Sequence, residues 1–505
     1  MYVNVKQNNK KMSAVSNGCI IDEHCENKSG EILIDSSKSP YSCTLNQTDI
    51  KDNKNKFYVM QLIKDGSNYI HFIRYGRVGE PGKSSHKRFT TENESIKSFE
   101  KQFRSKTRNH WVNRATFEKK EGKYFFTEIS YEKELQNINL KGVKTPDCSL
   151  DDRLQQFMRM ISDVKMMQSA LVDLEVDTKK MPLGKISPRQ ITKAQSLIGE
   201  IRLKIDIINK SKDASILDTT NSELVALSSK FYTFIPYACG RRKPPIINNS
   251  ELVDKFNNMT DDLNNLVIAT KIIKKQTADV HPLDRVYSEI KTKIVPVDKH
   301  SDTWNEIEKY VVNTHAPTHH FKTELVDIFE IERKGEFRKF KKFSKEIDNR
   351  QLLIHGSRMS NWCSILQQGL LLDPSRLGVK ITGKMFGYGV YFANSFSKST
   401  QYCGVSYGNG FACLALAEVA LGDECKKTTS DFYMSKKKLD KDGYDSTWGQ
   451  GNMTPSSETI LDGITIPNGK LIKSNVNSVL RYDEKIVYDG DQFRLKYLVI
   501  IKTKY

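Results

Sequence analysis

The stretch of this chain that most constrains its fold runs from Leu352 to Tyr402. It opens with an apolar run, Leu352-Leu353-Ile354, which predicts a short buried strand. That strand would deliver His355-Gly356-Ser357 at its end, and ligands are commonly bound where strands end. A histidine and a hydroxyl in such a place indicate a binding or catalytic site, although a lone histidine is more often a structural residue.

The rest of the stretch adds a helix and a glycine-flanked strand. A helical segment is expected from Asn361 to Gln368, and Gly369 would end it as a C-cap. Gly387 and Gly389 precede Val390-Tyr391-Phe392, and such glycines permit a tight turn or a close approach of the backbone. The pair leads into a strand and lacks a third glycine, so the pattern is not the dinucleotide fingerprint of a Rossmann fold.

Together, in this order and spacing, these segments resemble the NAD-binding signature of the poly(ADP-ribose) polymerases. The segments that carry the resemblance are His355-Gly356-Ser357, Met385-Phe386-Gly387-x-Gly389-x-Tyr391-Phe392-Ala393, Ser397-Lys398-Ser399-x-x-Tyr402 and Asp483-Glu484-Lys485-Ile486-Val487-Tyr488-Asp489. The last segment supplies the third member of the family's His-Tyr-Glu triad. The resemblance therefore implies that His355, Tyr391 and Glu484 are the catalytic residues.

The resemblance also implies which residues bind NAD, the expected substrate. They are His355, Gly356, Ser357, Tyr391, Lys398, Ser399 and Tyr402. Backbone groups of Gly356 and the hydroxyl of Ser399 would hold the carboxamide of nicotinamide. Tyr391 and Tyr402 would lie on either side of the nicotinamide ring. No metal is expected.

The same resemblance places the two riboses. His355 and Ser357 would bind the ribose on the adenosine side, and Glu484 would hydrogen-bond the other ribose and the acceptor hydroxyl. A carboxylate there would stabilise the oxocarbenium-like positive charge of the transition state, and a glutamate at this position implies chain elongation over single transfer. Lys384 stands where the family commonly has an aromatic residue and Tyr388 where it commonly has a lysine, and both positions would flank the acceptor groove.

The whole chain has the composition of a soluble protein of several domains. Its 505 residues are 38% hydrophobic and 28% charged. No apolar run approaches the roughly 18 residues of a membrane helix, and the first residues lack the apolar region of a secretory signal. The nine cysteines form no CxxC pair, which favours a reduced compartment. Cys19, His24 and Cys25 lack a second ligand pair, so a zinc finger is not expected there.

The formal charge of +18 is unevenly distributed. Residues 51–130 contain 18 Lys and Arg and 9 Asp and Glu, so this segment carries +9, half of the excess. Such a concentration, with aromatic residues interleaved, favours a polyanionic partner over a merely solvated face. Residues 1–50 are polar and show little apolar periodicity, so a disordered arm is expected there, without room for large zinc-finger modules.

Residues 51–145 are expected to form a compact β-rich domain. Its predicted elements are strands at Phe57–Ile63, Tyr69–Gly79 and Lys123–Ile129 and a helix at Asn93–Thr107. Tyr75-Gly76-Arg77 and Asn109-x-Trp111-x-x-Arg114 resemble the signature of the WGR domain, with tyrosine in place of its tryptophan. The resemblance implies that this domain binds DNA ends or nicks.

The expected DNA-binding residues are Tyr75, Arg77, Lys106, Arg108, Trp111 and Arg114. Their basic side chains would neutralise phosphates, and Tyr75 or Trp111 would stack on a base or sugar. The alternative is that both aromatic residues belong to the core. For Trp111 the sequence leaves the two roles evenly balanced.

Residues 149–275 have helical periodicity, which alone indicates an all-α bundle with no more than a scaffold role. Ser187-Pro188 is a helix-start signal, Phe231–Pro236 is expected to be a rigid connector, and Asp261-Asp262 a solvated helix face. Met181–Ser187 and Phe231–Asn249 resemble the regulatory helical domain of DNA-activated family members. By resemblance, the bundle shields the NAD site until DNA binding loosens it.

Residues 282–505 are expected to form the ADP-ribosyltransferase domain, a mixed α/β fold with antiparallel-rich sheets. Strands are predicted at Leu325–Ile331, Ala412–Val419 and Leu495–Ile501, and residues 423–475 would include a surface loop near the acceptor. The expected fold class is therefore multidomain α+β, with a β-rich domain, a helical bundle and this catalytic domain.

The leading functional hypothesis is a nuclear, DNA-break-activated poly(ADP-ribose) polymerase of the DNA damage response. The resemblance implies three kinds of partner: DNA strand breaks, acceptor proteins such as histones and the chain itself, and an accessory factor that directs acceptor choice. Two alternatives remain: a DNA-gated mono-ADP-ribosyltransferase, and a DNA-end-binding scaffold with a catalytically weak domain. The intact His355, Tyr391 and Glu484 argue against the scaffold.

Overall fold

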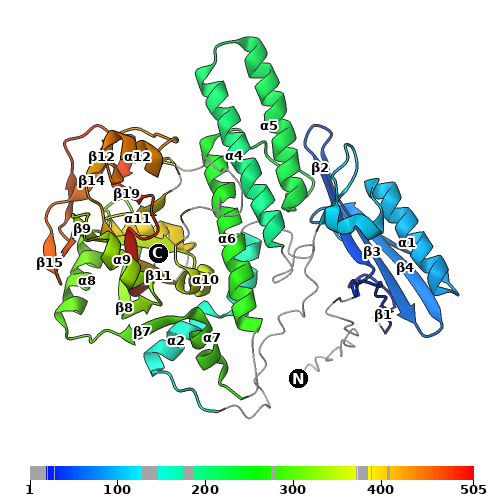
Figure 1. The fold of residues 1–505 in the computed structure, drawn as a ribbon, viewed down its shortest axis with the longest axis horizontal. Coiled ribbons are helices and arrows are strands. Elements are labelled where there is room, and N and C mark those ends of the chain that lie inside the picture. Colours follow the sequence, from blue (N-terminus) through cyan, green and yellow to red (C-terminus); the bar gives the residue numbers. More distant parts are fainter. Residues whose placement is uncertain are drawn as a thin grey trace, which may run out of the picture. The chain divides into compact units, whose positions relative to one another are not determined.

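The computed structural model describes residues 19, 21–27, 29–127, 146–173, 187–274, 279–370, 372, 385–387, 389–405 and 410–504. The chain forms two compact units, whose elements are labelled in Figure 1. Unit 1 comprises residues 1–136, 171–197 and 210–248, and unit 2 comprises residues 137–170, 198–209 and 249–505.

Unit 1 is built on an antiparallel sheet with the strand order β5-β4-β3-β2-β6, and β1 pairs with β3. The strands are β1 (Glu31–Ile32), β2 (Ser42–Asp49), β3 (Lys54–Asp65), β4 (Asn68–Arg77), β5 (Lys83–Phe89) and β6 (Phe125–Thr127). The strands predicted at Phe57–Ile63 and Tyr69–Gly79 are confirmed as the bodies of β3 and β4, and Lys123–Ile129 contains β6.

Helix α1 (Glu92–Thr107) and the 3-10 helix η1 (Trp111–Thr116) complete the core of this sheet. The α1 prediction is confirmed, and its first turn is capped by Thr91, whose hydroxyl accepts a hydrogen bond from the Glu94 amide. Phe99 and Phe103 stand one turn apart and pack edge-on against the Trp111 ring, with centroids 4.9 and 5.1 Å away.

The expectation of a disordered arm up to residue 50 is wrong for the described residues from 21 onward. Strand β2 lies between β3 and β6, and its Leu45 is fully buried. The polar residues that suggested disorder are partly used inside the sheet, since Asn46 Nδ2 donates to Thr127 Oγ1 at 2.7 Å. Residues 1–18 lie outside the described residues.

Unit 1 also contains α5 (Ala214–Phe234) and the first part of α4 (Pro188–Lys210), which begins after Ser187 as predicted. Helix α5 packs against β2, where the Thr48 amide donates to Thr233 Oγ1 at 3.2 Å. The rigid connector expected at Phe231–Pro236 is wrong up to Phe234, because these residues form the last turn of α5. Phe231 is fully buried there, so its apolar character reflects packing.

Unit 2 contains a sheet with the order β15-β16-β9-β11-β20-β8-β7, a second with the order β10-β19-β13-β12 and a third with the order β17-β14-β18. Their strands are β7 (Thr292–Pro296), β8 (Lys322–Arg333), β9 (Arg350–Ser357), β10 (Val390–Phe392), β11 (Gly410–Ala420), β12 (Glu424–Lys427), β13 (Ser446–Gly449), β14 (Gly451–Pro455), β15 (Thr459–Leu461), β16 (Ile464–Ile466), β17 (Leu471–Lys473), β18 (Leu480–Tyr482), β19 (Glu484–Val487) and β20 (Phe493–Lys504). Most neighbours are antiparallel, as predicted. Strand β11, between β9 and β20, is buried along most of its length, which explains its nearly continuous apolar run.

Residues 423–475 are more ordered than the predicted surface loop. They contain β12 to β17 and a short helix, α12 (Lys436–Asp442). The other helices of unit 2 are α2 (Asp152–Ile161), most of α3 (Val164–Asp173), the later part of α4, α6 (Ser250–Lys274), α7 (Pro282–Ile290), α8 (Asp302–Asn313), α9 (Glu336–Phe343), α10 (Trp362–Gln368), α11 (Phe396–Thr400) and the 3-10 helices η2 (Met359–Asn361) and η4 (Gln401–Cys403). In the described ranges, no helix combines the length and apolar character that crossing a bilayer requires.

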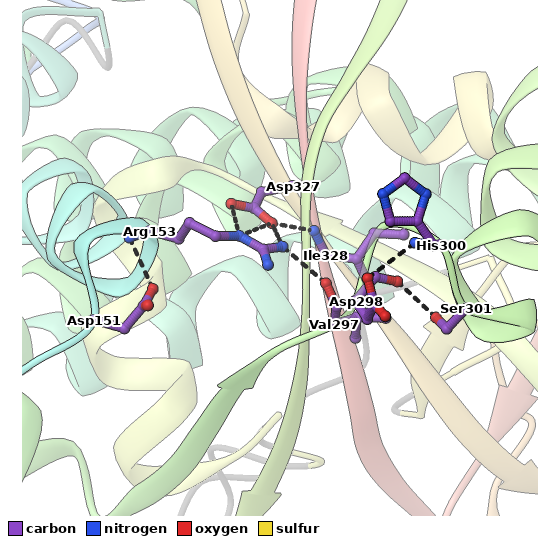
Figure 2. Close-up of polar contacts among 8 residues, drawn as sticks. All are labelled: Asp151, Arg153, Val297, Asp298, His300, Ser301, Asp327 and Ile328. Atoms are coloured by element: carbon purple, nitrogen blue, oxygen red, sulfur yellow. Dashed lines mark hydrogen bonds and ion pairs between the residues drawn. The ribbon is translucent and has the colours of Figure 1, made fainter.

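Helix α2 is fixed to the larger sheet of unit 2 by its first turn (Figure 2). Arg153 Nε lies 3.1 and 3.0 Å from the two carboxylate oxygens of Asp327 on β8. Its guanidinium also donates to the carbonyl oxygen of Val297 at 3.0 Å. An arginine that contacts both oxygens of a carboxylate is fixed in orientation as well as in distance. The first turn of α2 therefore has a defined position on the sheet.

Candidate active site

The predicted catalytic residues lie where the two larger sheets of unit 2 meet. Strand β9 ends at Ser357, and its Ile354 forms a two-way backbone bridge with Ala393, directly after β10. Strand β10 pairs with β19, which begins at Glu484. The bridge and this pairing bring together His355, Tyr391 and Glu484, which are far apart in the sequence.

The side chain of His355 contacts the backbone of Tyr391. Nδ1 of His355 lies 2.9 Å from the carbonyl oxygen of Tyr391, a distance that orients the imidazole ring. The Tyr391 hydroxyl donates to the carbonyl oxygen of Gly387 at 2.9 Å and accepts from the Phe386 amide at 2.8 Å. Burial raises the pKa of Tyr391 well above its ordinary value, so its hydroxyl stays protonated and holds the loop before β10.

Two glycines of the signature are required by close backbone contacts. A Cβ atom on Gly356 would lie 1.9 Å from the carbonyl oxygen of Ser399, so strand β9 and helix α11 could not approach as they do. Gly387 has a φ of +68° and a Cβ there would lie 2.0 Å from the Met434 carbonyl oxygen. The prediction of a tight turn or a close approach, made for Gly387 and Gly389, is confirmed, since a Cβ on Gly389 would lie 2.6 Å from the Val487 carbonyl oxygen.

Glu484 is partly buried and is paired with Lys398. Nζ of Lys398 donates to Glu484 Oε1 at 2.8 Å and to the Asp483 carbonyl oxygen at 3.1 Å. No bond from another described residue to Glu484 Oε2 was found, so this oxygen can accept from a bound hydroxyl. Without the family resemblance, Glu484 would be taken for an exposed charge at a sheet edge, but β19 lies between β10 and β13.

Helix α11 carries the last part of the signature. The Ser397 hydroxyl accepts from the Ala316 amide at 2.7 Å and lies 2.7 Å from His319 Nδ1, so the segment before β8 positions this helix. Ser399 is buried against β9, whereas Tyr402 is 56% exposed. Part of the Tyr402 ring is therefore accessible to a ligand.

Ser357 leads to a contact that the sequence did not indicate. Asn361 Nδ2 lies 2.9 Å from Ser357 Oγ and 2.7 Å from Asp262 Oδ1 on α6, and Asp262 also pairs with Arg358 at 2.9 Å. The expectation that Asp261-Asp262 forms a solvated face is therefore wrong for Asp262, whose side chain is only 14% exposed. The polar side chains of Ser357, Arg358 and Asn361, close together in the sequence, are the signal that could have indicated this contact.

The pKa of Asp262 is raised to about 6. Burial is the largest cause, and the charge of Asp261 adds to it. The positive charge of Arg358 and the hydrogen bond from Asn361 oppose the shift without cancelling it.

In unit 1, three of the predicted DNA-binding residues are placed for surface contacts. Tyr75 on β4 is 43% exposed and stacks on Tyr58 at 5.7 Å. Lys106 Nζ lies 4.7 Å from the centroid of the same Tyr58 ring, and Arg108 is exposed just after α1. Lys83 on β5, which sequence reasoning missed, lies directly opposite Tyr75 and is exposed.

The other three predicted DNA-binding residues make contacts within unit 1. Trp111 is only 4% exposed and belongs to the core, so of the two roles that the sequence left open for it the core role is the one observed. Arg114 forms an ion pair with Asp35 at 2.5 Å and stacks on Trp111. Arg77 donates to the carbonyl oxygens of Gly240 at 2.6 Å and Arg242 at 2.7 Å. The basic side chains of Arg77 and Arg114 are thus used for internal contacts.

Replacing Trp111 with alanine is expected to destabilise unit 1 by about 3–5 kcal/mol, because it leaves a cavity among buried rings. The neighbouring Val112 is 76% exposed, and its replacement by alanine should change stability by less than about 0.5 kcal/mol. Calorimetric melting of both variants checks this. Loss of DNA binding by Trp111→Ala without a lower melting temperature would instead show that Trp111 contacts DNA.

Several predicted positions lie outside the described residues. Lys384 and Tyr388, which would flank the acceptor groove, are among them, as is most of Met181–Ser187.

Three family comparisons match consecutive parts of the chain. Residues 41–118 match the WGR domain, residues 148–287 the poly(ADP-ribose) polymerase regulatory domain, and residues 301–503 the poly(ADP-ribose) polymerase catalytic domain. Together they contain all the predicted catalytic, NAD-binding and DNA-binding residues.

Whole-chain relatives agree with these matches. The chain is 35% identical over 484 residues to a poly [ADP-ribose] polymerase of Sarcophaga peregrina, covering 94% of this chain and 47% of that protein. It is 33% identical over 504 residues to poly [ADP-ribose] polymerase 2 of Homo sapiens, covering 96% of this chain and 83% of that protein. For poly [ADP-ribose] polymerase 2 of Zea mays the identity is 33%, covering 100% of this chain and 77% of that protein. The chain thus spans about half the length of the Sarcophaga peregrina relative and most of the length of the other two.

Proposed function

This chain belongs to the poly(ADP-ribose) polymerase family, and from that premise we propose that it transfers ADP-ribose from NAD to proteins and extends it into polymer. The observation that carries the proposal is the convergence of His355, Tyr391 and Glu484 at the junction of two sheets, with Lys398 paired to the glutamate.

In the proposed reaction the bond between nicotinamide and C1′ of its ribose breaks, and the bonding electron pair leaves with the ring nitrogen. An acceptor oxygen then forms a bond to C1′ and loses its proton. Glu484 Oε2 would accept hydrogen bonds from the ribose 2′-hydroxyl and from the acceptor hydroxyl, while Lys398 holds Oε1. The carboxylate thereby stabilises the positive charge that develops on the ribose.

The other signature residues would bind and orient NAD. Gly356 would present backbone groups and Ser399 its hydroxyl to the carboxamide. Tyr402 would supply its exposed face to the nicotinamide ring, opposite Tyr391. His355, oriented by its contact with the Tyr391 carbonyl oxygen, would bind the adenosine-side ribose together with Ser357.

Incubation with NAD labelled in its adenine ring tests the transferase activity. The proposal predicts release of nicotinamide together with label that stays covalently attached to protein after denaturation. Release of nicotinamide with only free ADP-ribose would indicate a hydrolase. No consumption of NAD under any condition would favour the scaffold.

We further propose that DNA breaks activate the enzyme in the nucleus and that acceptors include histones and the chain itself. The WGR match and the exposed Tyr75, Lys83 and Arg108 support a DNA-binding role for unit 1. The regulatory-domain match and the contact of Asp262 with Arg358 and Asn361 support a gate. In the undisturbed chain α6 would hold the residues next to Ser357, and DNA binding would loosen this hold.

Asp262→Ala is expected to raise activity without DNA by roughly 5- to 30-fold. The substitution removes an ion pair and a hydrogen bond, and because Arg358 is 26% exposed we expect about 1–2 kcal/mol rather than the 3–5 of a fully buried pair. Initial rates of NAD consumption without DNA provide the measurement, and the exposed Asn258→Ala on the same helix is the matched control. Equal rates in both variants would contradict a gate at Asp262.

The raised pKa of Asp262 also predicts a pH effect. The docked carboxyl has a pKa of about 6 against 3.8 for the free group, so the docked state binds the proton more tightly. Docking of α6 is therefore strongest at low pH and weakens as the pH rises through the pKa of the docked carboxyl, about 6. DNA-independent activity should accordingly decrease when the pH is lowered from about 7.5 to about 5.5. The neutral Asp262→Asn should lack this component, and a pH profile identical to that of the unmodified chain would contradict the assignment.

A further inference from the structure

A thiol, an imidazole and a carboxylate meet where the start of α2 approaches the start of α7. Cys148 comes shortly before α2, and His281 and Asp284 stand three residues apart at the first turn of α7. One ligand atom from each of the three residues lies within 4.8 Å of those of the other two. All three belong to unit 2 and are partly buried. In the part of the chain that the structure describes, this is the one such group identified as able to hold a metal ion.

Part of this arrangement serves the local fold. Asp284 accepts hydrogen bonds from the Ser149 amide at 3.1 and 3.2 Å and from its hydroxyl at 3.1 Å, and His281 caps α7 by accepting from the Leu283 amide at 3.3 Å. The carboxylate alone would anchor the loop. The Cys148 thiol, 3.3 Å from Asp284 Oδ1, is a weak donor and adds little to that anchor. The local fold therefore does not require a thiol beside an imidazole and a carboxylate.

We propose that Cys148, His281 and Asp284 bind a zinc ion. One sulfur, one nitrogen and one oxygen ligand suit Zn²⁺, which accepts all three and prefers four ligands in a tetrahedron. Three protein ligands leave the fourth position to water. On binding, the S–H bond of Cys148 breaks, a sulfur–zinc bond forms and the thiol proton is released to solvent, so affinity rises with pH.

The ion would join two segments within the regulatory-domain match: Cys148, before α2, and the first turn of α7. Helix α2 packs against α7, and Arg153 already seats the first turn of α2 on Asp327 of the catalytic sheet (Figure 2). A zinc ion bound at Cys148, four residues before the start of α2 at Asp152, would brace the same turn from α7. The site lies outside the proposed catalytic residues, so its occupancy is independent of the transferase proposal.

Cobalt substitution in the full-length chain tests the ligand set. Co²⁺ bound through Cys148 should produce a thiolate-to-cobalt absorption band that zinc abolishes. Cys148→Ser should remove the band, and Asp284→Asn and His281→Asn, which keep an acceptor for the Ser149 and Leu283 amides, should weaken Zn²⁺ binding by about 100-fold or more. Absence of the band in the unmodified chain, or a band that persists in Cys148→Ser, would overturn the proposal.

Thiol protection gives a second test that needs no variant. Cys148, Cys239 and Cys425 are partly exposed, and the other six cysteines are buried. Alkylation followed by peptide mass spectrometry should show that Zn²⁺ slows modification of Cys148 at least about tenfold and leaves Cys239 and Cys425 unchanged. Equal alkylation of Cys148 with and without Zn²⁺ would show that Cys148 is not a ligand and would overturn the proposal. Equal protection of all three cysteines would show adventitious binding only and would overturn it as well.

Discussion

Glu484→Gln is expected to reduce polymer formation by about two to three orders of magnitude while the chain remains folded. Glutamine keeps the size of the side chain but carries no negative charge to stabilise the ribose cation or to polarise the acceptor hydroxyl. It also leaves Lys398 without its ion-pair partner. The polymer is measured by gel electrophoresis after a timed reaction with labelled NAD.

The matched control for this experiment is Glu458→Gln, a solvent-exposed carboxylate in the same domain. It should make polymer of normal length. Glu484→Gln should retain some nicotinamide release, because residues that hold NAD are unchanged. Undiminished long polymer from Glu484→Gln would remove Glu484 from the mechanism.

Arg77→Ala is expected to lower DNA-stimulated activity by about tenfold and to change DNA affinity much less. Its guanidinium donates to the carbonyl oxygens of Gly240, Arg241 and Arg242 and to Asn53 rather than facing outward. Hydrogen bonds from a charged donor contribute about 1.5–3 kcal/mol each when buried. Because Arg77 is partly exposed, we count only about 1.4 kcal/mol in total, which corresponds to the tenfold change.

We expect Arg77→Ala to affect stimulation more than DNA affinity because Arg77 contacts the loop that connects unit 1 to α6. The loop at residues 240–242 precedes α6, which carries Asp262, so loss of the Arg77 contacts would loosen the chain segment between the sheet of unit 1 and the proposed gate. Arg88→Ala, on the exposed β5, is the control and should weaken DNA binding in a salt-dependent way. A loss of DNA affinity in Arg77→Ala as large as its loss of stimulation would instead assign Arg77 to a phosphate.

The elements that could be predicted from the sequence are those whose pattern is local. The strand before His355 and the helix before Gly369 are marked by apolar runs and breakers, and both are found where expected. Gly387 was informative because its requirement is local and steric: its φ is positive and a Cβ there would collide with the Met434 carbonyl oxygen.

The predictions that failed concern partners distant in sequence. In strand β2 the polar residue Asn46 is buried and donates a hydrogen bond to Thr127. Residues near Asn46 in the sequence give no indication of that partner. Asp262 has the appearance of a solvated acid, but its partners Arg358 and Asn361 lie about a hundred residues away. For Trp111 the sequence left the choice between core and ligand contact open, because its burial depends on where α1 packs.

The most direct test of the account is the rate of NAD consumption and the size of the product, measured with and without a nicked, 5′-phosphorylated DNA duplex. Little activity is expected without DNA, and a ladder of high-mass, protein-attached product is expected when the duplex is added. Equal activity with and without the duplex would contradict the DNA gate. Stimulated transfer of a single ADP-ribose would contradict elongation.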